Sequence, residues 1–393
     1  MLSKILKTDL TEQMVAWRHH LHKHPELSFE ENITSDYIAS VLLSKDIEIH
    51  RGLAVTGIVA TVKGKNPGPV IGLRADMDAL PIFELNTFDY KSAHEGKMHA
   101  CGHDGHSAML LGAAVFLQEN NNFSGTVHFI FQPAEEGGGG GRVMVEEGLF
   151  EIFPCQEVYG MHNWPGLKKG CFAVHDNEVM AAVETLDITV KGRGGHAAMP
   201  DQCIDPIVAS SQIISALQSV VSRNVKPTDS AVLSITAINA GSAYNVIPND
   251  VKIKGTLRYF DNNVGEMIKT KVHSIVENIG SSIGVSASLT LTPSYPATIN
   301  AKEHAEKCAK AASMVAGEEN VYRDMSPSMG SEDFSFILNA SQGAYIWIGN
   351  GTVPKDQPEG GCMLHNAQYD FNDDVLALGV SYWVQLVFNI LKT

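Results

Sequence analysis

The chain has 393 residues, of which 44% are hydrophobic and 19% charged, and its formal net charge is -15. This length exceeds the usual size of a single core, so two domains are expected, and the composition excludes a disordered chain. The negative charge and the lack of a Lys/Arg cluster exclude a nucleic-acid partner, because phosphate binding requires a basic patch.

The two ends of the chain indicate a protein without a membrane segment. The opening MLSKILKTDLTEQ reaches Asp9 before an apolar stretch develops, so we expect no secretory signal and a cytoplasmic protein. Residues 375–391 are apolar, but Ser381, Gln385 and Asn389 recur at every fourth position, which predicts an amphipathic helix packed on a core. The six cysteines form no C-x-x-C pair, so neither a disulfide framework nor a structural zinc site is expected.

The first predicted helix spans residues 11–23, and Pro25 follows it closely. A group of histidines lies at its end, but the histidines fall on different helix faces. We therefore interpret this group as a solvated helix end and not as a metal site. Its members are His19, His20, His22 and His24.

From residue 70 onward, strands and helices alternate. This β-α-β order predicts an α/β fold with a mostly parallel sheet flanked by helices. Further apolar strands follow after the first repeat, and the last of them comes much later in the chain. The expected strands are residues 70–73, 127–131, 157–161 and 344–348, and the expected helix is residues 104–118.

The intervening segment has its own order of elements, β-α-β-β-α-β, which is the ferredoxin-like order. We therefore predict an inserted domain over residues 181–292, with residues 1–180 and 293–393 forming one catalytic domain. The expected strands are residues 184–190, 231–239, 251–260 and 286–291, and the expected helices are residues 205–223 and 264–283.

Polar residues follow three of the parallel strands at the point where each strand ends. Asp76 and Asp78 follow the first strand, Glu135 and Glu136 the second, and His162 the third. In open α/β sheets, ligands bind outside the carboxyl ends of the strands. The sequence therefore predicts one shared site at this edge.

The segment HACGHDGH adds a thiolate and imidazoles just before a helix. Cys101 and His103 are two residues apart, and the glycines around them let the backbone approach a cation. We expect Asp104 to be the helix N-cap and His106 to be a packed helix residue. Cysteine and histidine beside carboxylates favour Zn²⁺, Mn²⁺, Co²⁺ or Ni²⁺ over Ca²⁺ or Mg²⁺. The alternative, a Cys101 nucleophile activated by His103, needs no carboxylates from other strands.

The pair Glu135–Glu136 suggests a division of roles. Neighbouring side chains diverge in an extended segment, so one carboxylate should bind a metal ion and the other should act as the base that takes a proton from water. Spacing alone leaves open which does which. The glycines at 137–141 are interpreted as a mobile active-site loop and not as a phosphate cradle, because no Lys-Ser/Thr helix start follows them.

Nine motifs along the chain resemble those of a known family, the two-metal amidohydrolases and metallopeptidases that include aminoacylases, carboxypeptidases and hippurate hydrolases. They occur in the family's order over nearly the whole chain, and Cys101 places the chain in the cysteine-containing branch. The motifs are RHHLHKHPELSFEE, GLRADMDALP, HACGHDGH, residues 131–141, GMHNWP, GRGGHAAMP, AYNVIP, SEDFS and MLHN. The resemblance implies a zinc-peptidase-like catalytic domain.

The resemblance also implies roles for individual residues. It implies Glu135 as the general base, and two divalent transition-metal ions per subunit. Arg74 stands where the wider superfamily has a metal-binding histidine, so we expect Asp76 and Asp78 to support the ligands without binding metal themselves. The implied metal ligands are Cys101, His103, Glu136, His162 and His365.

In the inserted domain, the resemblance implies that His196 donates a hydrogen bond to the substrate oxyanion, in its own or a partner subunit's site. Asn245 and Arg258 would bind the substrate carboxylate, and a homodimer would form through this lid-like domain. The expected reaction is hydrolysis of N-acyl amino acids, of the hippurate or N-acetyl type. The alternatives are a metallo-carboxypeptidase or dipeptidase, a Cys101 thiol hydrolase, and a binding module, which the complete set of site residues disfavours.

Overall fold

The protein divides into two compact units. The structure, a computed structural model, describes residues 8–351 and 362–392. One unit, which we call the split unit, is built from the described parts of Met1–Val179, Thr298–Pro327 and Asp333–Thr393. The other, the inserted unit, comprises Met180–Ala297 and Ser328–Glu332, against a predicted insertion of residues 181–292.

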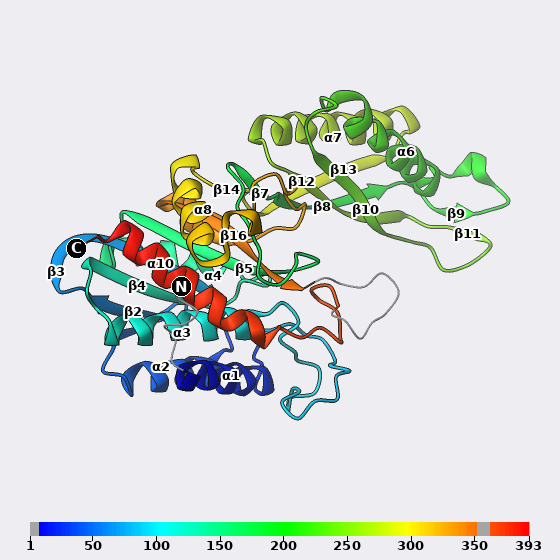
Figure 1. The fold of residues 1–393 in the computed structure, drawn as a ribbon. Coiled ribbons are helices and arrows are strands. Elements are labelled where there is room, and N and C mark those ends of the chain that lie inside the picture. Colours follow the sequence, from blue (N-terminus) through cyan, green and yellow to red (C-terminus); the bar gives the residue numbers. More distant parts are fainter. Residues whose placement is uncertain (1–7, 352–361, 393) are drawn as a thin grey trace. The chain divides into compact units, whose positions relative to one another are not determined.

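The split unit is built on a mostly parallel sheet, as the sequence predicts (Figure 1). The four central strands, β4, β3, β5 and β16, run parallel, and antiparallel strands join them at both sides. Among the described residues the sheet order is β1 (Glu48–Leu53), β2 (Gly57–Lys63), β4 (Ser124–Gln132), β3 (Asn66–Asp76), β5 (Glu157–Pro165), β16 (Gln342–Gly351), β6 (Phe172–Ala173) and β15 (Val321–Tyr322).

Helices bury the central strands of this sheet. The most deeply buried helix is α3 (His103–Glu119), in which every residue from His103 to Leu117 is buried. It packs against α1 and α10, and α10 packs against α8. Because strands buried on both faces must be apolar throughout, β3 and β4 carry continuous apolar runs. The other helices are α1 (Thr8–Lys23), α2 (Asn32–Leu43), α4 (Gly140–Glu146), α5 (Leu149–Ile152), α8 (Lys302–Ala316), α9 (Phe334–Ala340) and α10 (Leu376–Ile390).

The last helix differs from its prediction in one detail. Helix α10 packs on the core as expected, but Ser381 is buried, and its hydroxyl donates to the carbonyl of Ala377 at 2.7 Å. A buried serine in a helix satisfies its hydroxyl in this way. Gln385 and Asn389 remain partly exposed. Within the described part of the chain, no helix is long and apolar enough to cross a membrane.

The inserted unit has the ferredoxin-like arrangement that its element order predicts (Figure 1). Its antiparallel sheet has the order β10-β12-β8-β13, and burial alternates along β12, so one face is buried and the other is not. Its two helices each begin after an aspartate that caps them, Asp205 and Asp261. The elements are β8 (Ala182–Lys191), β9 (Gly195–His196), α6 (Pro206–Asn224), β10 (Ala231–Ala240), β11 (Val246–Ile247), β12 (Asp250–Tyr259), α7 (Asn262–Ile283) and β13 (Ser286–Tyr295).

Candidate metal centre

The six residues predicted for the metal centre meet in the split unit. The ligand-type atoms of Cys101, Glu136 and His365 lie within 4.8 Å of one another, and so do those of His103, Glu135 and Glu136. The Sγ atom of Cys101 lies 3.4 Å from Nε2 of His162. Glu136 belongs to both groups and therefore connects them. The side chains that follow the three strand ends therefore lie close together, as the order of strands in the sequence predicts.

The side chain of His103 tests whether this cluster fits a metal ion. Its Nδ1 contacts the carbonyl and the carboxylate of Asp78 at 2.9 and 3.1 Å. Its Nε2 is buried and has no hydrogen-bond partner among the described residues. It lies 3.8 Å from a carboxylate oxygen of Asp76 and 4.0 Å from those of Glu135 and Glu136. Two ligands on one ion, each about 2.1 Å from it, are separated by about 3.4 to 4.2 Å. The residues therefore fit a bound cation.

The orientation of His162 toward Cys101 also suits a bound cation. The Nδ1 of His162 donates to the carbonyl of Asn163 at 2.6 Å, which leaves Nε2 facing the thiol. Burial lowers the pKa of His162 well below its usual value, so the imidazole is neutral and can bind metal. Burial, Glu136 and Glu135 raise the pKa of Cys101 well above its usual value. An activated nucleophile needs the opposite surroundings, so the thiol-hydrolase alternative is disfavoured.

His365 reaches the cluster from a loop near the end of the chain. Its backbone lies in the left-handed region, with φ of 64°, and its N–H donates to the carbonyl of Ala100 at 2.7 Å. Its Nε2 lies 3.2 Å from Oε1 of Glu136, and its side chain is 52% exposed. Apart from the motif MLHN, which the family resemblance supplies, no pattern of strands or spacing in the sequence places this histidine at the site.

The cluster lies in a negative field. Burial alone would lower the pKa of His103, but Asp76, Asp78 and Glu136 raise it to about 10. Asp76 accepts from His106 Nδ1 at 2.6 Å and from Arg74 at 2.8 Å. Positive charge is therefore strongly favoured at this point. A carboxylate oxygen of Asp76 also lies within 4.8 Å of ligand-type atoms of His103, His106 and His162, and the supporting role expected for the two aspartates stays a prediction.

His106 lies beside the cluster but is already committed to other partners. Its Nε2 accepts the backbone N–H of Asn163 at 2.9 Å while its Nδ1 faces Asp76. Both ring nitrogens are thus in hydrogen bonds, which agrees with the expected packed helix residue. Its ring also meets that of His162 edge-on, with centroids 4.5 Å apart.

Two expectations for the charged residues behind the site are wrong. Asp104 is not the N-cap of α3, because that position is Gly102, with φ of 94°. Asp104 is buried and accepts from Arg18 at 3.2 Å and from His22 at 2.9 Å. His22 is fully buried, and its other nitrogen contacts Glu84 at 3.1 Å, so the group of histidines is not a solvated helix end. A buried arginine requires carboxylate partners, and Arg18 was the signal that sequence reasoning missed.

The backbone after β4 also differs from its prediction. Residues 135–138 form a turn and not an extended segment, and Ala134 before them has φ of 56°. Because of this turn, Glu135 and Glu136 do not diverge but both face His103. The last glycines of the run, Gly140 and Gly141, begin α4 and are not part of a loop.

The candidate residues of the inserted unit lie on its surface. His196 pairs with Val246, and the N–H of Ala197 donates to the carbonyl of Asn245, so the predicted histidine and asparagine are neighbours. Nδ1 of His196 accepts from the N–H of Ala198 at 3.1 Å, which places the proton of a neutral imidazole on Nε2 as a free donor. Arg258, on β12, is half-buried and donates to the carbonyl of Met329 at 2.8 Å.

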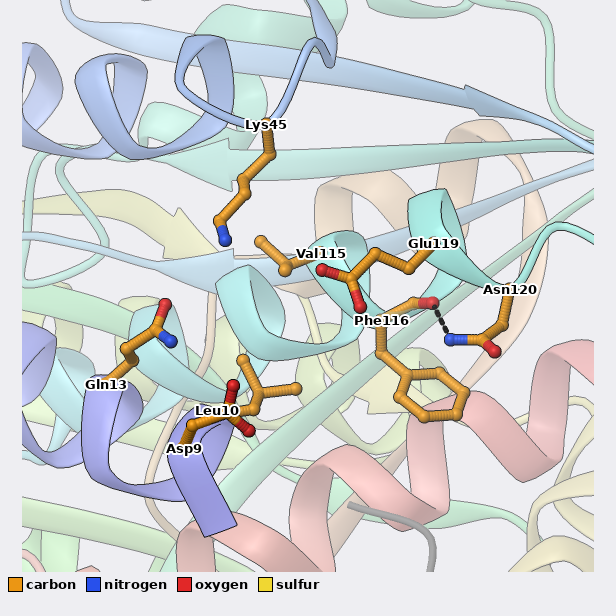
Figure 2. A pocket seen from close by; sticks show the side chains of 8 residues that line it. All are labelled: Asp9, Leu10, Gln13, Lys45, Val115, Phe116, Glu119 and Asn120. Atoms are coloured by element: carbon orange, nitrogen blue, oxygen red, sulfur yellow. Dashed lines mark hydrogen bonds between the residues drawn. The ribbon is translucent and has the colours of Figure 1, made fainter. Parts of the chain in front are cut away.

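A cavity of about 360 Å³ lies at the other end of α3 (Figure 2). It is lined by Lys45, by Asp9 of α1 and by Glu119 of α3, with Phe116 and Asn120 joined by a 2.9 Å hydrogen bond. Phe116 is 13 positions after His103 in helix α3, which corresponds to about 20 Å along the helix at 1.5 Å per residue. Histidine and cysteine are absent from its lining, so this cavity is not the metal centre.

Comparison with known proteins links this geometry to a family. The model of peptidase family M20/M25/M40 matches residues 72–389. Hippurate hydrolase of Campylobacter jejuni is 40% identical over 384 residues, which cover 98% of each chain. N-acetylcysteine deacetylase of Bacillus subtilis is 38% identical over 97% of each chain. The solved structure of a dinuclear metal-binding M20 peptidase from Bacillus subtilis superposes with a TM-score of 0.84 at 33% identity, over 98% of this chain and 100% of that one.

Proposed function

The chain belongs to peptidase family M20/M25/M40, and from that premise we propose that it hydrolyses the amide bond of N-acyl amino acids to a carboxylic acid and a free amino acid. Membership of this hydrolase family confirms the resemblance that the motifs indicate. The observation that carries the proposal is the buried Nε2 of His103, which has no hydrogen-bond partner among the described residues and faces three carboxylates at 3.8 to 4.0 Å. The proposed substrates are hippurate, which is N-benzoylglycine, and N-acetyl amino acids.

Two divalent transition-metal ions, of manganese, zinc, cobalt or nickel, are proposed as the cofactor. When bound, they would polarise the scissile carbonyl and make water more acidic. Support comes from the donor set, because thiolate, imidazole and carboxylate together suit such ions. Glu136 groups both with Cys101 and His365 and with His103 and Glu135, so it is proposed among the residues that would hold the ions. The proposed ligands are Cys101, His103, Glu136, His162 and His365.

Glu135 is proposed as the general base. It is 7% exposed, so its carboxylate is accessible to a water molecule but shielded from bulk solvent. It removes a proton from water as the water oxygen bonds to the carbonyl carbon, and it transfers that proton to the amide nitrogen as the C–N bond breaks. Glu136, and not Glu135, groups with Cys101 and His365, which favours Glu136 as the ligand and Glu135 as the base.

The inserted unit is proposed to bind and enclose the substrate. The Nε2–H of His196 would stabilise the carbonyl oxyanion, in its own or a partner subunit's site. Arg258 and Asn245 would hold the α-carboxylate, since a guanidinium binds a carboxylate through two parallel hydrogen bonds. Closure of this unit as a lid and a homodimer formed through it remain predictions.

A substrate panel with metal analysis tests the proposal. Purified protein is stripped with a chelator, reloaded with Mn²⁺, Zn²⁺, Co²⁺ or Ni²⁺, and assayed on benzoyl-glycine, acetyl amino acids and dipeptides. We expect two ions per chain, no activity in the stripped protein, and preference for the acyl amino acids. Preference for dipeptides would instead identify a dipeptidase. Activity that survives stripping but is lost with a thiol reagent would identify a Cys101 hydrolase.

A further inference from the structure

The conformation of one alanine determines where the two glutamates of the site point. Ala134 has φ of 56°, a left-handed conformation that costs a residue with a Cβ atom about 1 to 2 kcal/mol. It immediately precedes Glu135 and Glu136, whose carboxylates both lie 4.0 Å from Nε2 of His103. Such a conformation persists only where surrounding contacts hold it.

Two hydrogen bonds hold the backbone of Ala134: its carbonyl accepts the N–H of Gly140 at 3.0 Å, and its own N–H is accepted by a buried carboxylate far away in the sequence. Oε1 of Glu31 accepts the N–H of Ala134 at 2.9 Å and also the N–H of Phe29 at 2.9 Å. Oε2 accepts the hydroxyl of Thr56 at 2.7 Å, and Glu31 is fully buried. Phe29 also has positive φ, 65°, so one carboxylate joins two left-handed turns.

The same N-terminal segment contacts the glutamate turn at further points. Ser28 donates to Asp78 at 2.9 Å, and the same carboxylate oxygen of Asp78 accepts the N–H of Glu136 at 2.9 Å. The ring of Phe29 packs so closely on Gly138 that a Cβ there would lie 2.9 Å from it. Residues 28–31 thus contact the turn from Ala134 to Gly138 on both sides of the two glutamates.

A role in capping helix α2 does not account for Glu31. Although Glu31 stands at the N-cap position of α2, its side chain makes no capping hydrogen bond to that helix. The N–H of Thr34 in the first turn of α2 is instead accepted by Glu26 at 2.8 Å. Glu26 therefore caps helix α2, whereas Glu31 binds the backbone before the turn that carries Glu135 and Glu136.

We propose that Glu31 is a positioning residue for the hydrolysis: by holding Ala134 in its left-handed conformation, it directs both Glu135 and Glu136 toward His103. This inference rests on the proposed function for the role of Glu135. Among the described residues, Glu31 is in none of the groups of ligand-type atoms, so its role is to position other residues. Glu26 provides a matched control, because it is a buried carboxylate of the same segment that also accepts a backbone N–H.

The first test compares Glu31→Ala with Glu26→Ala at saturating Mn²⁺. We expect Glu31→Ala to lower kcat by about 10- to 100-fold, since misplacement of a catalytic group by about 1 Å costs up to about 100-fold, with KM little changed. Glu26→Ala should lower the melting temperature and leave kcat unchanged. Equal losses of kcat in both variants, or no loss in Glu31→Ala, would overturn the inference.

A second readout needs no substrate, so it stands even if the proposed reaction is wrong. Glu136 lies in the turn that follows Ala134. Loss of a contact that supports a metal ligand weakens metal binding by about 10-fold or more. We therefore expect Glu31→Ala to weaken the affinity of stripped protein for Mn²⁺, measured by calorimetry, while Glu26→Ala binds normally. Normal Mn²⁺ affinity in Glu31→Ala would contradict the inference whatever the substrate panel shows.

A rescue experiment tests whether Glu31 acts through the backbone of Ala134. Glycine adopts positive φ without steric cost, so Ala134→Gly added to Glu31→Ala should restore part of the lost kcat and Mn²⁺ affinity. Failure of any rescue would show that Glu31 does not act through Ala134. If Glu31→Ala does not fold, Thr56→Val carries the test, because it removes one partner of Glu31. It should lower kcat by a few-fold at unchanged KM, and an unchanged kcat would overturn the inference.

Discussion

The two units of this protein use polar side chains in opposite ways. In the split unit, charged groups such as Arg18, Asp76 and Asp104 are fully buried and joined in networks around one cluster of potential ligands. In the inserted unit, His196 and Asn245 are exposed and Arg258 is half-buried. Parallel strands buried on both faces force polar groups to pair at the strand ends, whereas an antiparallel sheet with one open face leaves them in solvent. Metal binding and proton transfer should therefore depend on the split unit, and the inserted unit should contribute substrate binding and, through His196, the oxyanion donor.

The largest expected effect concerns the base. Glu135→Ala should lower kcat by about 1,000-fold or more, because it removes proton transfer and leaves the proposed metal ligands in place. Metal content, measured by elemental analysis, should stay at the wild-type value. Glu146→Ala, an exposed glutamate of α4 paired with Arg142, is the control and should be fully active. Normal turnover in Glu135→Ala would show that the chemistry lies elsewhere.

A smaller effect should appear in the pH dependence of stability. Burial disfavours the charged form of His22, but the hydrogen bonds that its ring donates to Asp104 and Glu84 raise its pKa to about 9. The folded state therefore binds this proton more tightly than the unfolded state, whose histidine titrates near 6.5. The stabilisation is complete below about pH 6.5 and is lost as pH rises through 9, by at most about 3 kcal/mol.

This pH effect can be measured on the split unit alone. The four tryptophans, Trp17, Trp164, Trp347 and Trp383, all lie in that unit, so their fluorescence during urea unfolding reports on it. The free energy of unfolding should fall between pH 6.5 and 9, and His22→Gln should flatten the fall. His273→Gln, at an exposed position of α7 in the inserted unit, should leave the slope unchanged. If His22→Gln does not change the slope, protonation of His22 does not cause the pH dependence.

Metal affinity tests the residues that support the ligands. Asp78 contacts Nδ1 of His103 and holds its ring in place, so Asp78→Asn should weaken metal binding by about 10- to 100-fold. Competition with a chelator measures the change. Asp36→Asn, at an exposed aspartate of α2, is the control. Unchanged affinity in Asp78→Asn would mean that the backbone carbonyl of Asp78, which also contacts Nδ1, is sufficient.

The smallest effect is expected in the inserted unit. Arg258→Lys keeps the charge but loses the two-pronged geometry, so kcat/KM should fall by about 10-fold, through KM. Arg223→Lys, at an exposed position near the end of α6, should behave as wild type. A fall in kcat at unchanged KM would contradict this role, because Arg258 would then act in the chemical step and not in substrate binding.

The arrangement of elements could be read from the sequence because it depends on local patterns. Apolar runs and their order predicted the parallel sheet and the ferredoxin-like unit, and both are present. The edge strands β1 and β15 were missed, because β1 is mostly exposed and has no continuous apolar run and β15 has only two residues. His22 was misjudged because its partners, Asp104 and Glu84, are more than 60 residues away.

What the sequence by itself determined is the chemistry of the site: which thiolate, imidazoles and carboxylates are available, and that three strand ends deliver them to one edge. Only the tertiary structure decided their orientation. The left-handed backbone at Ala134 runs against the local preference of alanine and exists because Glu31, 103 residues earlier, accepts its N–H. His365 reaches Glu136 in the same way, through its backbone contact with Ala100. Such contacts join residues distant in the chain, so no local pattern encodes them.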